Sequence, residues 1–570
     1  MSLPPVLAGP RRRLMAALVL NGSSQAAIAL SVGLLTHRLF VDLANPAPTT
    51  GVGSLAVAVL ALVVLALAQL LLRGIERRDA ERLGHDYIGE LRQRLFRRLL
   101  SLSPRSAATR SRGGITLRLV GDLRALRMWI SLGLARGVVC SLSTCGAVAA
   151  LWLIDPWLSV TAACVSGLGI PLAAGLGRRV QPRVREARSL SGRLAASLTE
   201  RVGALGLIQS NGQARRELRR LGRLHRRSAD AAAAQALPLA LLRASGDTIA
   251  ALTGVAVLAV GAWRATQGHG DAGVVASSLV LVGLMLPGLR ELGLALAHLQ
   301  GASVARERIA EFAEFGRVIE DAPAGADPGA VDWRRADWTF EAVRLDTALH
   351  HVDARIPGDG LTALIGPNGA GKSSVLSLMA RLCDPDEGEI RVAGRALASI
   401  PLRDLRRRIG LVSTQLSGEG AMLRGSLRYN LCYRAPRADA AAQAAVLVRC
   451  GLWERVQSLP RGLDTRVLEG GANFSPGERL RWSLARALLG RPAVLLVDET
   501  DAGLDHEACA VLDHVLDGFG GTVLIATQRW ARVAGAKHVL ALRDGRVAFE
   551  GRPSDFLSVD TRARSASRSG

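Results

Sequence analysis

The sequence predicts a multi-pass α-helical membrane domain followed by an α/β domain of the phosphate-loop type. Three observations support this prediction. Apolar segments of membrane-spanning length recur before residue 300, short β-like and helical runs alternate after Trp333, and a glycine-rich loop stands between a strand-like and a helix-like run in that second part. At 570 residues the chain is too long for a single core.

Six segments are apolar over roughly the 20 residues that a bilayer-spanning helix needs. They cover residues 14–37, 51–73, 132–154, 157–176, 236–263 and 273–298. The first follows a basic stretch, as a secretory signal would, but it is too long and has no clear small-residue cleavage site. It is therefore interpreted as a span, and residues 1–318 are predicted to form a six-helix membrane domain.

The net charge of +23 is concentrated in two long connections between spans. Arginines crowd residues 73–127 and 178–227, whereas the short connections near residues 45–46, 155–156 and 268–270 carry almost none. This asymmetry predicts that both termini and the basic connections are cytoplasmic, as in a bacterial-type inner (plasma) membrane with membrane lipid around the helices. A nucleic-acid surface is the weaker explanation because no aromatic residues interleave with the arginines, so no nucleic acid is expected as a partner.

The basic connections also show helical periodicity. In residues 87–100 and 189–221, apolar side chains recur at helical spacing among the charges, which predicts long cytoplasmic extensions of the membrane helices. A solvated amphipathic face or attachment to anionic lipid would give the same pattern. A Pro/Gly/Ala-rich linker at 319–331 then leads into an α/β domain at 332–556, and the polar tail at 557–570 is expected to be disordered.

The segment Gly366–Ser373 is a phosphate-binding loop. It lies between a strand-like run at 361–365 and a helix-like run at 374–382, which is the order that phosphate binding needs. Lys372 is one of only two lysines in the chain and is suited to reach the β and γ phosphates. The residues expected to bind nucleotide here are Gly366, Pro367, Asn368, Gly369, Ala370, Gly371, Lys372, Ser373 and Ser374.

A second nucleotide element follows about 125 residues later, a spacing read directly from the sequence. The apolar run 493–497 predicts a buried strand that delivers Asp498 and Glu499 to its C-terminal end, where α/β sheets place their ligands. Asp498 can hold magnesium and Glu499 can polarise an attacking water. An apolar strand that ends in Asp-Glu is a weak signal alone, but together with the phosphate loop it strongly indicates a nucleotide site.

At this point the chain resembles the ATP-binding cassette (ABC) transporters, in particular exporter-type half-transporters. The segment 474–488 is similar to the signature motif and its helix, Gln415 to the glutamine loop, 502–505 to the D-loop and 469–471 to the loop that senses the membrane domain. In the membrane half, residues 91–102, 113–122 and 155–156 resemble the six-helix exporter domain.

The resemblance implies an ATPase that couples hydrolysis to transport, as a dimer with a second half-transporter subunit, either a homodimer or a heterodimer. ATP and Mg²⁺ are the implied cofactors, with Glu499, Gln528 and Lys372 in catalytic roles. The implied magnesium residues are Ser373, Gln415 and Asp498. The signature residues that would face ATP across the dimer interface are Phe474, Ser475, Pro476, Gly477 and Glu478.

Three departures from the family pattern suggest slow turnover or two unequal sites. Gln528 stands where the family usually has histidine, and Pro476 replaces a signature glycine. Asp346 or Thr347 falls where an aromatic usually stacks on adenine, and the nearby aromatics, Trp338 and Phe340, are offset. The alternative function is an ATP-binding regulatory or structural membrane subunit with little hydrolysis, against which the presence of Glu499 argues.

Ionisable residues within the spans suggest a polar cavity. They are Arg243 with Asp247, and Arg290 with Glu291. Snorkelling or structural pairing near the cytoplasmic end is equally compatible with their positions. Lipid, peptide, thiol compound and xenobiotic all remain open as the transported substrate.

Overall fold

The computed structural model describes residues 3–44, 52–109, 115, 118–268, 272–323, 331–413, 422–498 and 505–558. The chain divides into two compact units. One, the membrane unit, contains residues 1–100 and 107–316, and the other, the cassette unit, contains 101–106 and 317–570.

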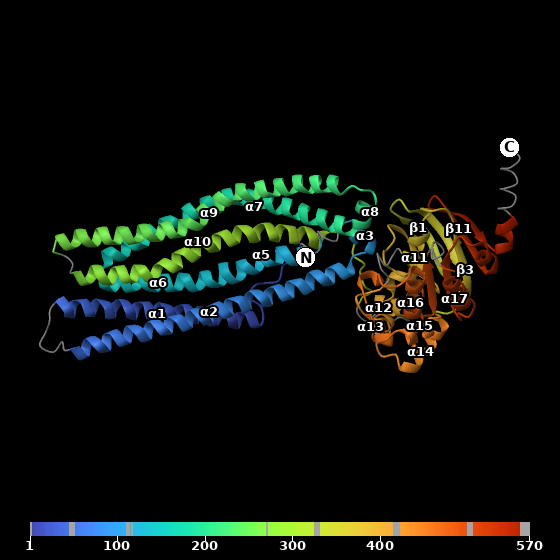
Figure 1. The fold of residues 1–570 in the computed structure, drawn as a ribbon, viewed down its shortest axis with the longest axis horizontal. Coiled ribbons are helices and arrows are strands. Elements are labelled where there is room, and N and C mark those ends of the chain that lie inside the picture. The colour runs from blue at the N-terminus through green and yellow to red at the C-terminus, as the bar shows by residue number, and fades with distance from the viewer. Residues whose placement is uncertain are drawn as a thin grey trace. The chain divides into compact units, whose positions relative to one another are not determined.

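Long helices that lie lengthwise beside one another build the membrane unit (Figure 1). They are α1 (Pro10–Ala44), α2 (Val52–Ser101), α6 (Arg136–Ile154), α7 (Pro156–Gly203), α9 (Ala214–Thr266) and α10 (Ala272–Glu314). Shorter turns between them are α3 (Pro104–Ala108), α5 (Leu123–Met128) and α8 (Leu205–Ser210), with π-type turns η1 (Arg118–Asp122) and η2 (Trp129–Ala135). The chain is thus a multi-pass membrane protein.

Five stretches of the described helices are long and apolar enough to cross a membrane. They are Pro10–Leu43, Leu55–Ser101, Leu119–Ile154, Ala214–Thr266 and Gly273–Glu314. The remaining expected span, 157–176, forms the first part of α7 and is not among the five. The predicted helical extensions are present, because α2, α7 and α9 each run far beyond their apolar parts without a break.

Packing within the membrane unit joins helices that are distant in sequence. Helix α7 packs along α9, α10 packs against α9 and α6, and α1 packs against α6. Helix α2 differs, because none of its most apolar 18-residue stretch is buried. Its exposed aliphatic side chains, such as Leu60 and Leu70, suit contact with lipid tails or with another chain.

Two sheets form the cassette unit. The antiparallel sheet has the order β2 (Leu349–Ile356), β1 (Trp338–Leu345), β4 (Glu387–Val392), β5 (Arg395–Ala396). The larger sheet has the order β12 (Arg546–Gly551), β11 (His538–Arg543), β3 (Gly360–Ile365), β10 (Thr522–Ala526), β9 (Val494–Asp498), β6 (Ile409–Ser413), with every neighbouring pair parallel except β11 and β12. A two-stranded ribbon joins β7 (Gly425–Ser426) to β8 (Arg466–Val467).

Helices connect the strands; some of them pack on the larger sheet, and others pack mainly on neighbouring helices. They are α11 (Lys372–Met379), α12 (Leu402–Arg408), α13 (Leu427–Leu431), α14 (Ala440–Arg449), α15 (Trp453–Ser458), α16 (Pro476–Leu489), α17 (His506–Asp517) and α18 (Trp530–Gly535), with 3-10 turns η3 (Leu397–Ser399), η4 (Gly462–Asp464) and η5 (Glu469–Gly471). All five residues of β9 are buried, which explains its continuous apolar run. The sheet thereby holds the C-terminal ends of β3 and β9 rigidly, at two strands separated only by β10.

The segment Ser101–Ser106 belongs to the cassette unit although it directly follows α2. The Ser103 backbone N–H donates to the Arg317 carbonyl at 3.1 Å, and the Ile319 N–H donates to the Ser101 carbonyl at 2.9 Å. An isolated antiparallel bridge joins Leu102 to Val318. These bonds attach the segment to the start of the cassette, so the structure divides the chain at 316/317 rather than at 318 and transfers this segment out of the membrane unit.

Candidate nucleotide-binding site

The phosphate loop connects β3 to α11, as its sequence predicts. Its glycines adopt backbone angles that other residues resist: φ is +84° at Gly369 and +102° at Gly371. A Cβ atom on Gly371 would also lie 2.7 Å from the Ala348 carbonyl oxygen. The loop therefore needs glycine here both for its conformation and for its close approach to the β1–β2 turn.

Lys372 begins α11 and its side chain is buried within the loop. Its Nζ donates to the carbonyls of Gly366 at 2.9 Å and Pro367 at 3.0 Å. The ammonium thus lies over the loop, on the side where backbone N–H groups at a helix N-terminus favour an anion. A compact ammonium fits this turn better than a forked guanidinium.

Asp498 ends β9, and its carboxylate accepts hydrogen bonds from two hydroxyl groups. Ser373 Oγ donates to Asp498 Oδ1 at 2.9 Å, and Ser413 Oγ donates to Asp498 Oδ2 at 3.1 Å. The carboxylate is only 1% exposed. A buried carboxylate between two hydroxyls offers the hard oxygen ligands that Mg²⁺ prefers, so these side chains fit the ion that the sequence implied.

Ser413 is a site residue that sequence reasoning missed. It is the last residue of β6 and pairs in register with Asp498 on β9. The available signal was its position at the end of a strand next to the Asp-bearing strand, but the pairing of β6 with β9 is not visible in the sequence.

Gln528 follows β10 and lies beside the phosphate loop. Its Nε2 donates to Asn368 Oδ1 at 3.1 Å. The structure therefore brings the residue that replaces the usual histidine to the loop that is expected to bind phosphate, where its amide can donate a hydrogen bond but cannot carry a proton.

The signature segment forms the N-terminus of α16 through a capping box. The Glu478 N–H donates to Ser475 Oγ at 3.0 Å, and the Ser475 N–H donates to Glu478 Oε2 at 2.8 Å. Pro476 occupies the first helical turn, where a missing N–H costs little. Ser475 and Pro476 are exposed whereas Phe474 is buried, so the segment presents its helix terminus outward. Gly477 packs closely on Asp505, which caps α17.

Two expected site residues, Gln415 and Glu499, lie outside the described residues, as does 502–504 of the predicted D-loop. Their predicted roles stay predictions. The two aromatics near the expected adenine position are in the core: Trp338 is fully buried and Phe340 is 3% exposed. Neither can offer a ring face to a nucleotide.

A cavity of about 420 Å³ adjoins the phosphate loop. Its lining residues are Arg105, Ala348, Asn368, Gly369, Gly371, Lys372, Ser373 and Ser374. Five of them belong to the predicted loop, Ser374 directly follows it, and none of these lining residues belongs to the signature segment. The cavity and the exposed signature are thus separate surfaces of one cassette. Arg105 was not predicted, because it lies far from the loop in sequence.

Two family models match the chain. The model for the ABC transporter transmembrane region matches residues 14–287, and the model for the ABC transporter, the ATP-binding domain, matches residues 349–502. The chain belongs to the ABC transporters. Both parts are fused in one chain, which makes this ABC transporter an exporter-type half-transporter with an ATPase cassette.

Curated relatives share about a quarter of their residues with this ABC transporter. An ATP-dependent lipid A-core flippase of Alkalilimnicola ehrlichii is 28% identical over 83% of this chain and 81% of the relative. A flippase of the same name from Ralstonia nicotianae is 27% identical over 68% of this chain, and the match spans 66% of that relative. The uncharacterized ABC transporter ATP-binding protein YknV of Bacillus subtilis is 24% identical over 84% of this chain and 79% of its own.

A solved structure shares the fold of this ABC transporter. The structure of a bacterial Atm1-family ABC exporter with ATP bound gives a TM-score of 0.86 at 22% identity, and the match covers 96% of each chain. The fold predicted from the sequence, a helical membrane domain followed by an ATP-binding α/β cassette, is confirmed.

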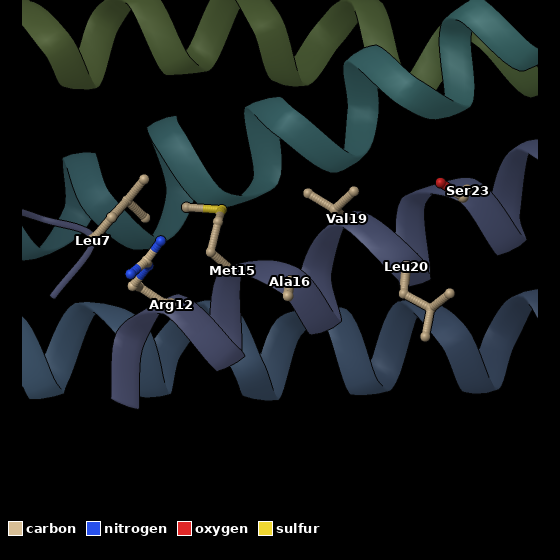
Figure 2. Close-up of a pocket in the computed structure, with 7 residues that line it drawn as sticks. All are labelled: Leu7, Arg12, Met15, Ala16, Val19, Leu20 and Ser23. Atoms are coloured by element: carbon tan, nitrogen blue, oxygen red, sulfur yellow. The ribbon is translucent and has the colours of Figure 1, made fainter. Parts of the chain in front are cut away.

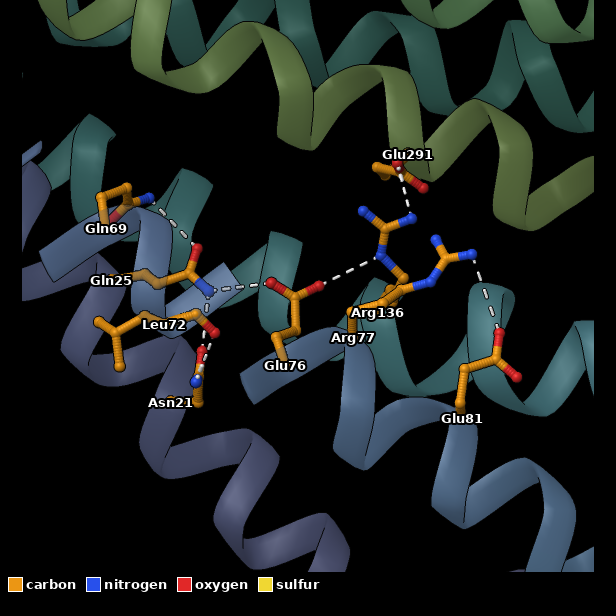
Figure 3. Close-up of polar contacts among 9 residues, drawn as sticks. All are labelled: Asn21, Gln25, Gln69, Leu72, Glu76, Arg77, Glu81, Arg136 and Glu291. Carbon is orange, nitrogen blue, oxygen red and sulfur yellow. Dashed lines mark hydrogen bonds and ion pairs between the residues drawn. The ribbon is translucent and has the colours of Figure 1, made fainter. Parts of the chain in front are cut away.

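A buried polar network lies inside the membrane unit of this ABC transporter (Figure 3). Arg136 pairs with Glu76 at 3.2 Å and with Glu291 at 2.9 Å. Glu76 in turn accepts from Gln25 at 2.9 Å. Glu291 therefore has a partner on another helix, which the sequence did not reveal. Of the other ionisable residues predicted in the spans, Asp247 is exposed, and the side chains of Arg243 and Arg290 lie outside the described ones.

Two cavities in the membrane unit have mainly apolar linings. One, of about 420 Å³ near the start of α1, is formed by Leu7, Arg12, Met15, Ala16, Val19, Leu20 and Ser23 (Figure 2). The other, of about 320 Å³, is formed by Ile28, Ala29, Val32, Leu62, Leu65, Ala66, Gln69, Arg73, Ser143 and Leu284. The second adjoins the polar network, because Gln69 Nε2 donates to Gln25 Oε1 at 3.3 Å.

Proposed function

We propose that this half-transporter works as a dimer that binds two ATP molecules with Mg²⁺ between its cassettes and exports a substrate across a bacterial inner membrane. The observation that carries the proposal is the Ser373–Asp498–Ser413 cluster. Ser413 and Asp498 end the neighbouring strands β6 and β9, and Lys372 and Ser373 begin α11 after β3. Metal-assisted phosphoryl transfer requires such an arrangement of carboxylate, hydroxyl and ammonium.

Each residue has a defined task in this proposal. Loop N–H groups and Lys372 bind the β and γ phosphates. Mg²⁺, when bound, neutralises charge that develops on the phosphates, and Ser373, Asp498 and Gln415 are proposed to hold it. Glu499 is proposed to orient the attacking water and accept its proton. Gln528 donates a hydrogen bond to the γ-phosphate region from beside Asn368.

The outward-facing signature supports the dimer. The capped N-terminus of α16 offers N–H groups and positive potential, while the phosphate cavity in the same cassette contains no residue from 474–478. A second subunit, identical or different, is therefore proposed to supply Phe474, Ser475, Pro476, Gly477 and Glu478 to each ATP. The basic connections support a cytoplasmic position for the cassette.

A lipid-like amphiphile is the substrate class that we favour. Two of the relatives described above are named lipid A-core flippases. The cavity of about 320 Å³ in the membrane unit combines aliphatic walls with Gln69 and Arg73, which suits a molecule with an apolar part and an anionic group.

Steady-state ATP hydrolysis in lipid nanodiscs tests the proposed function. Glu499→Gln should abolish the activity while ATP still binds, and Glu454→Gln, which changes an exposed carboxylate on α15 in the same way, should leave it unchanged. Stimulation by a lipid amphiphile and not by peptides would support the substrate class.

Two other results would argue against the proposal. Activity that survives Glu499→Gln would remove the proposed base. ATP binding without hydrolysis above that variant would contradict a self-sufficient homodimer and would favour either a partner half-transporter or the regulatory role that the sequence left open.

A further inference from the structure

Among the described residues that line the phosphate-loop cavity, Arg105 alone comes from outside the 348–374 segment. It lies on α3, directly after α2, within the short segment that packs with the cassette. The cavity places its side chain together with Gly369, Lys372 and Ser373. A guanidinium at this position requires explanation, because the loop already has its own cation.

Backbone hydrogen bonds fix Arg105 in place. The segment that carries it bonds on both sides to the chain that enters the cassette, through Ser103 N–H to the Arg317 carbonyl and Ile319 N–H to the Ser101 carbonyl. Ser103 Oγ also accepts the Ser106 N–H at 3.1 Å, which closes the turn around Arg105. The backbone that carries Arg105 is therefore held by the cassette unit.

Arg105 pairs with Asp346, which together with Thr347 falls where the family usually has an adenine-stacking aromatic. Arg105 Nε lies 3.8 Å from Asp346 Oδ2. Asp346 adopts φ of +43° in the β1–β2 turn, and its N–H donates to the Asp386 carboxylate, so its backbone is fixed as well. Both side chains are about half exposed (45% and 51%), so the ion pair leaves part of the Arg105 side chain accessible.

Ala348, two residues after Asp346 in the same turn, lines the phosphate cavity together with Arg105. A nucleotide with its phosphates on the loop would extend its base along this wall. The phosphates already have Lys372, the loop N–H groups and the start of α11. The charge of Asp346 partly offsets that of Arg105 and so weakens the attraction of Arg105 for phosphate, while the Arg105 side chain stays 45% exposed.

We propose that Arg105 is the base platform of this ATP site, with its guanidinium stacked on adenine in place of the missing aromatic and oriented by Asp346. Guanidinium planes stack on nucleobases, whereas an ammonium has no such plane. The platform follows α2 directly in the chain, so the base of ATP contacts the polypeptide as it leaves the membrane unit. This inference rests on the proposed ATP site and specifies how that site holds the base.

The test compares two ligands that share phosphates but not a base. Binding of a non-hydrolysable ATP analogue and of inorganic tripolyphosphate, both with Mg²⁺, would be measured by calorimetry on the full-length protein in nanodiscs. Arg105→Ala should weaken the ATP analogue about 10-fold, the scale of losing one stacked base, and leave tripolyphosphate within about 2-fold. Arg105→Lys should lose as much affinity for the ATP analogue as Arg105→Ala does, and Arg105→Trp should retain that affinity.

The control is Arg97→Ala, an exposed arginine on α2, which should change neither affinity. Three results would overturn the inference: equal loss of both ligands in Arg105→Ala, which would indicate a phosphate contact; wild-type affinity in Arg105→Lys, which would show that charge suffices; or no change in Arg105→Ala. Lys372→Ala, which should lose both ligands, separates this inference from the ATP site itself. If the unsubstituted protein bound neither ligand, the site as well as the platform would be refuted.

Discussion

Ser373 Oγ lies 2.9 Å from Asp498 Oδ1, although 125 residues separate them in sequence. The hydroxyl opens α11 and the carboxylate ends β9, so two elements of one sheet bring them together. A serine hydroxyl and an aspartate carboxylate at this distance can both bind one divalent cation.

Asp498→Asn should lower ATP hydrolysis by about 100-fold or more, because one carboxylate ligand for Mg²⁺ is replaced by a neutral amide. The amide can still bond to the hydroxyls of Ser373 and Ser413, so the thermal midpoint without metal should change little. Hydrolysis measured against Mg²⁺ concentration checks this prediction. Chelation of Mg²⁺ should reduce the unsubstituted protein to the level of the variant.

Ser413→Ala provides the matched control, since it removes one hydrogen bond to Asp498 but keeps the carboxylate. Its activity should fall by about 10-fold at most. Asp498→Asn with wild-type activity and an unchanged magnesium requirement would contradict the assigned metal position.

Gln528→His should introduce a pH-dependent step into ATP hydrolysis near about pH 6.5. The residue lies beside Asn368 at the loop, where a protonated imidazole would add positive charge toward the γ-phosphate. Relative to the unsubstituted protein, the variant should therefore gain activity as pH falls from about 8 to about 6. Gln528→Ala, which removes the donor, should lower activity by about 10-fold without a new step. Identical pH profiles for Gln528→His and the unsubstituted protein would show that this side chain does not reach the reacting phosphate.

Local patterns in the sequence were sufficient to predict the long helices and the phosphate loop. The apolar spacing in 87–100 and 189–221 predicted helical extensions; α2 continues through the first segment, whereas the second is divided among the end of α7, α8 and the start of α9. The order of strand, glycine loop and helix predicted the turn around Lys372, because that chemistry depends on neighbours in the chain. Each of these features depends on residues that lie close together in sequence.

Features that depend on tertiary pairing could not be predicted in this way. Ser413 reaches Asp498 only because β6 lies beside β9 in register. Arg105 reaches the cavity because a segment after α2 bonds to residues 317–319, more than 200 positions later in the sequence. The periodicity of a single segment contains no information about which distant element packs against it.

Arg136→Leu should destabilise the membrane unit by about 3–5 kcal/mol, because it removes the cation that the buried Glu76 shares with the partly exposed Glu291. The side chain of Glu76 is only 6% exposed, so water cannot replace the lost partner. Folded yield and thermal midpoint in detergent measure the effect. Adding Glu76→Gln and Glu291→Gln to Arg136→Leu should recover most of the loss, since no buried charge then remains in the network.

An exposed pair on the same unit serves as control. Arg185 pairs with Glu307 across α7 and α10 with both side chains about half exposed, so Arg185→Leu should cost less than about 1 kcal/mol. Equal losses of stability in Arg136→Leu and Arg185→Leu would indicate that the Arg136 network stabilises the membrane unit no more than a surface ion pair does.

His538 predicts how the stability of the cassette depends on pH. Burial at the start of β11 lowers the pKa of His538 below its usual value of 6.5, and the Glu550 charge opposes this effect only in part. Below about pH 6.5 the unfolded chain therefore binds a proton that the folded cassette resists, and folding stability falls as pH decreases. The loss of stability stops once pH drops below the lowered pKa, where both the folded and the unfolded state are protonated.

His538→Gln removes this dependence, so its thermal midpoint should fall less than that of the unsubstituted protein between about pH 7.5 and about pH 5.5. Glu550→Gln should have the opposite effect, because it removes the charge that favours protonation of His538 and thereby steepens the dependence. Thermal unfolding of all three proteins over this range distinguishes the cases, and parallel curves would show that His538 titrates alike in the folded and unfolded chain.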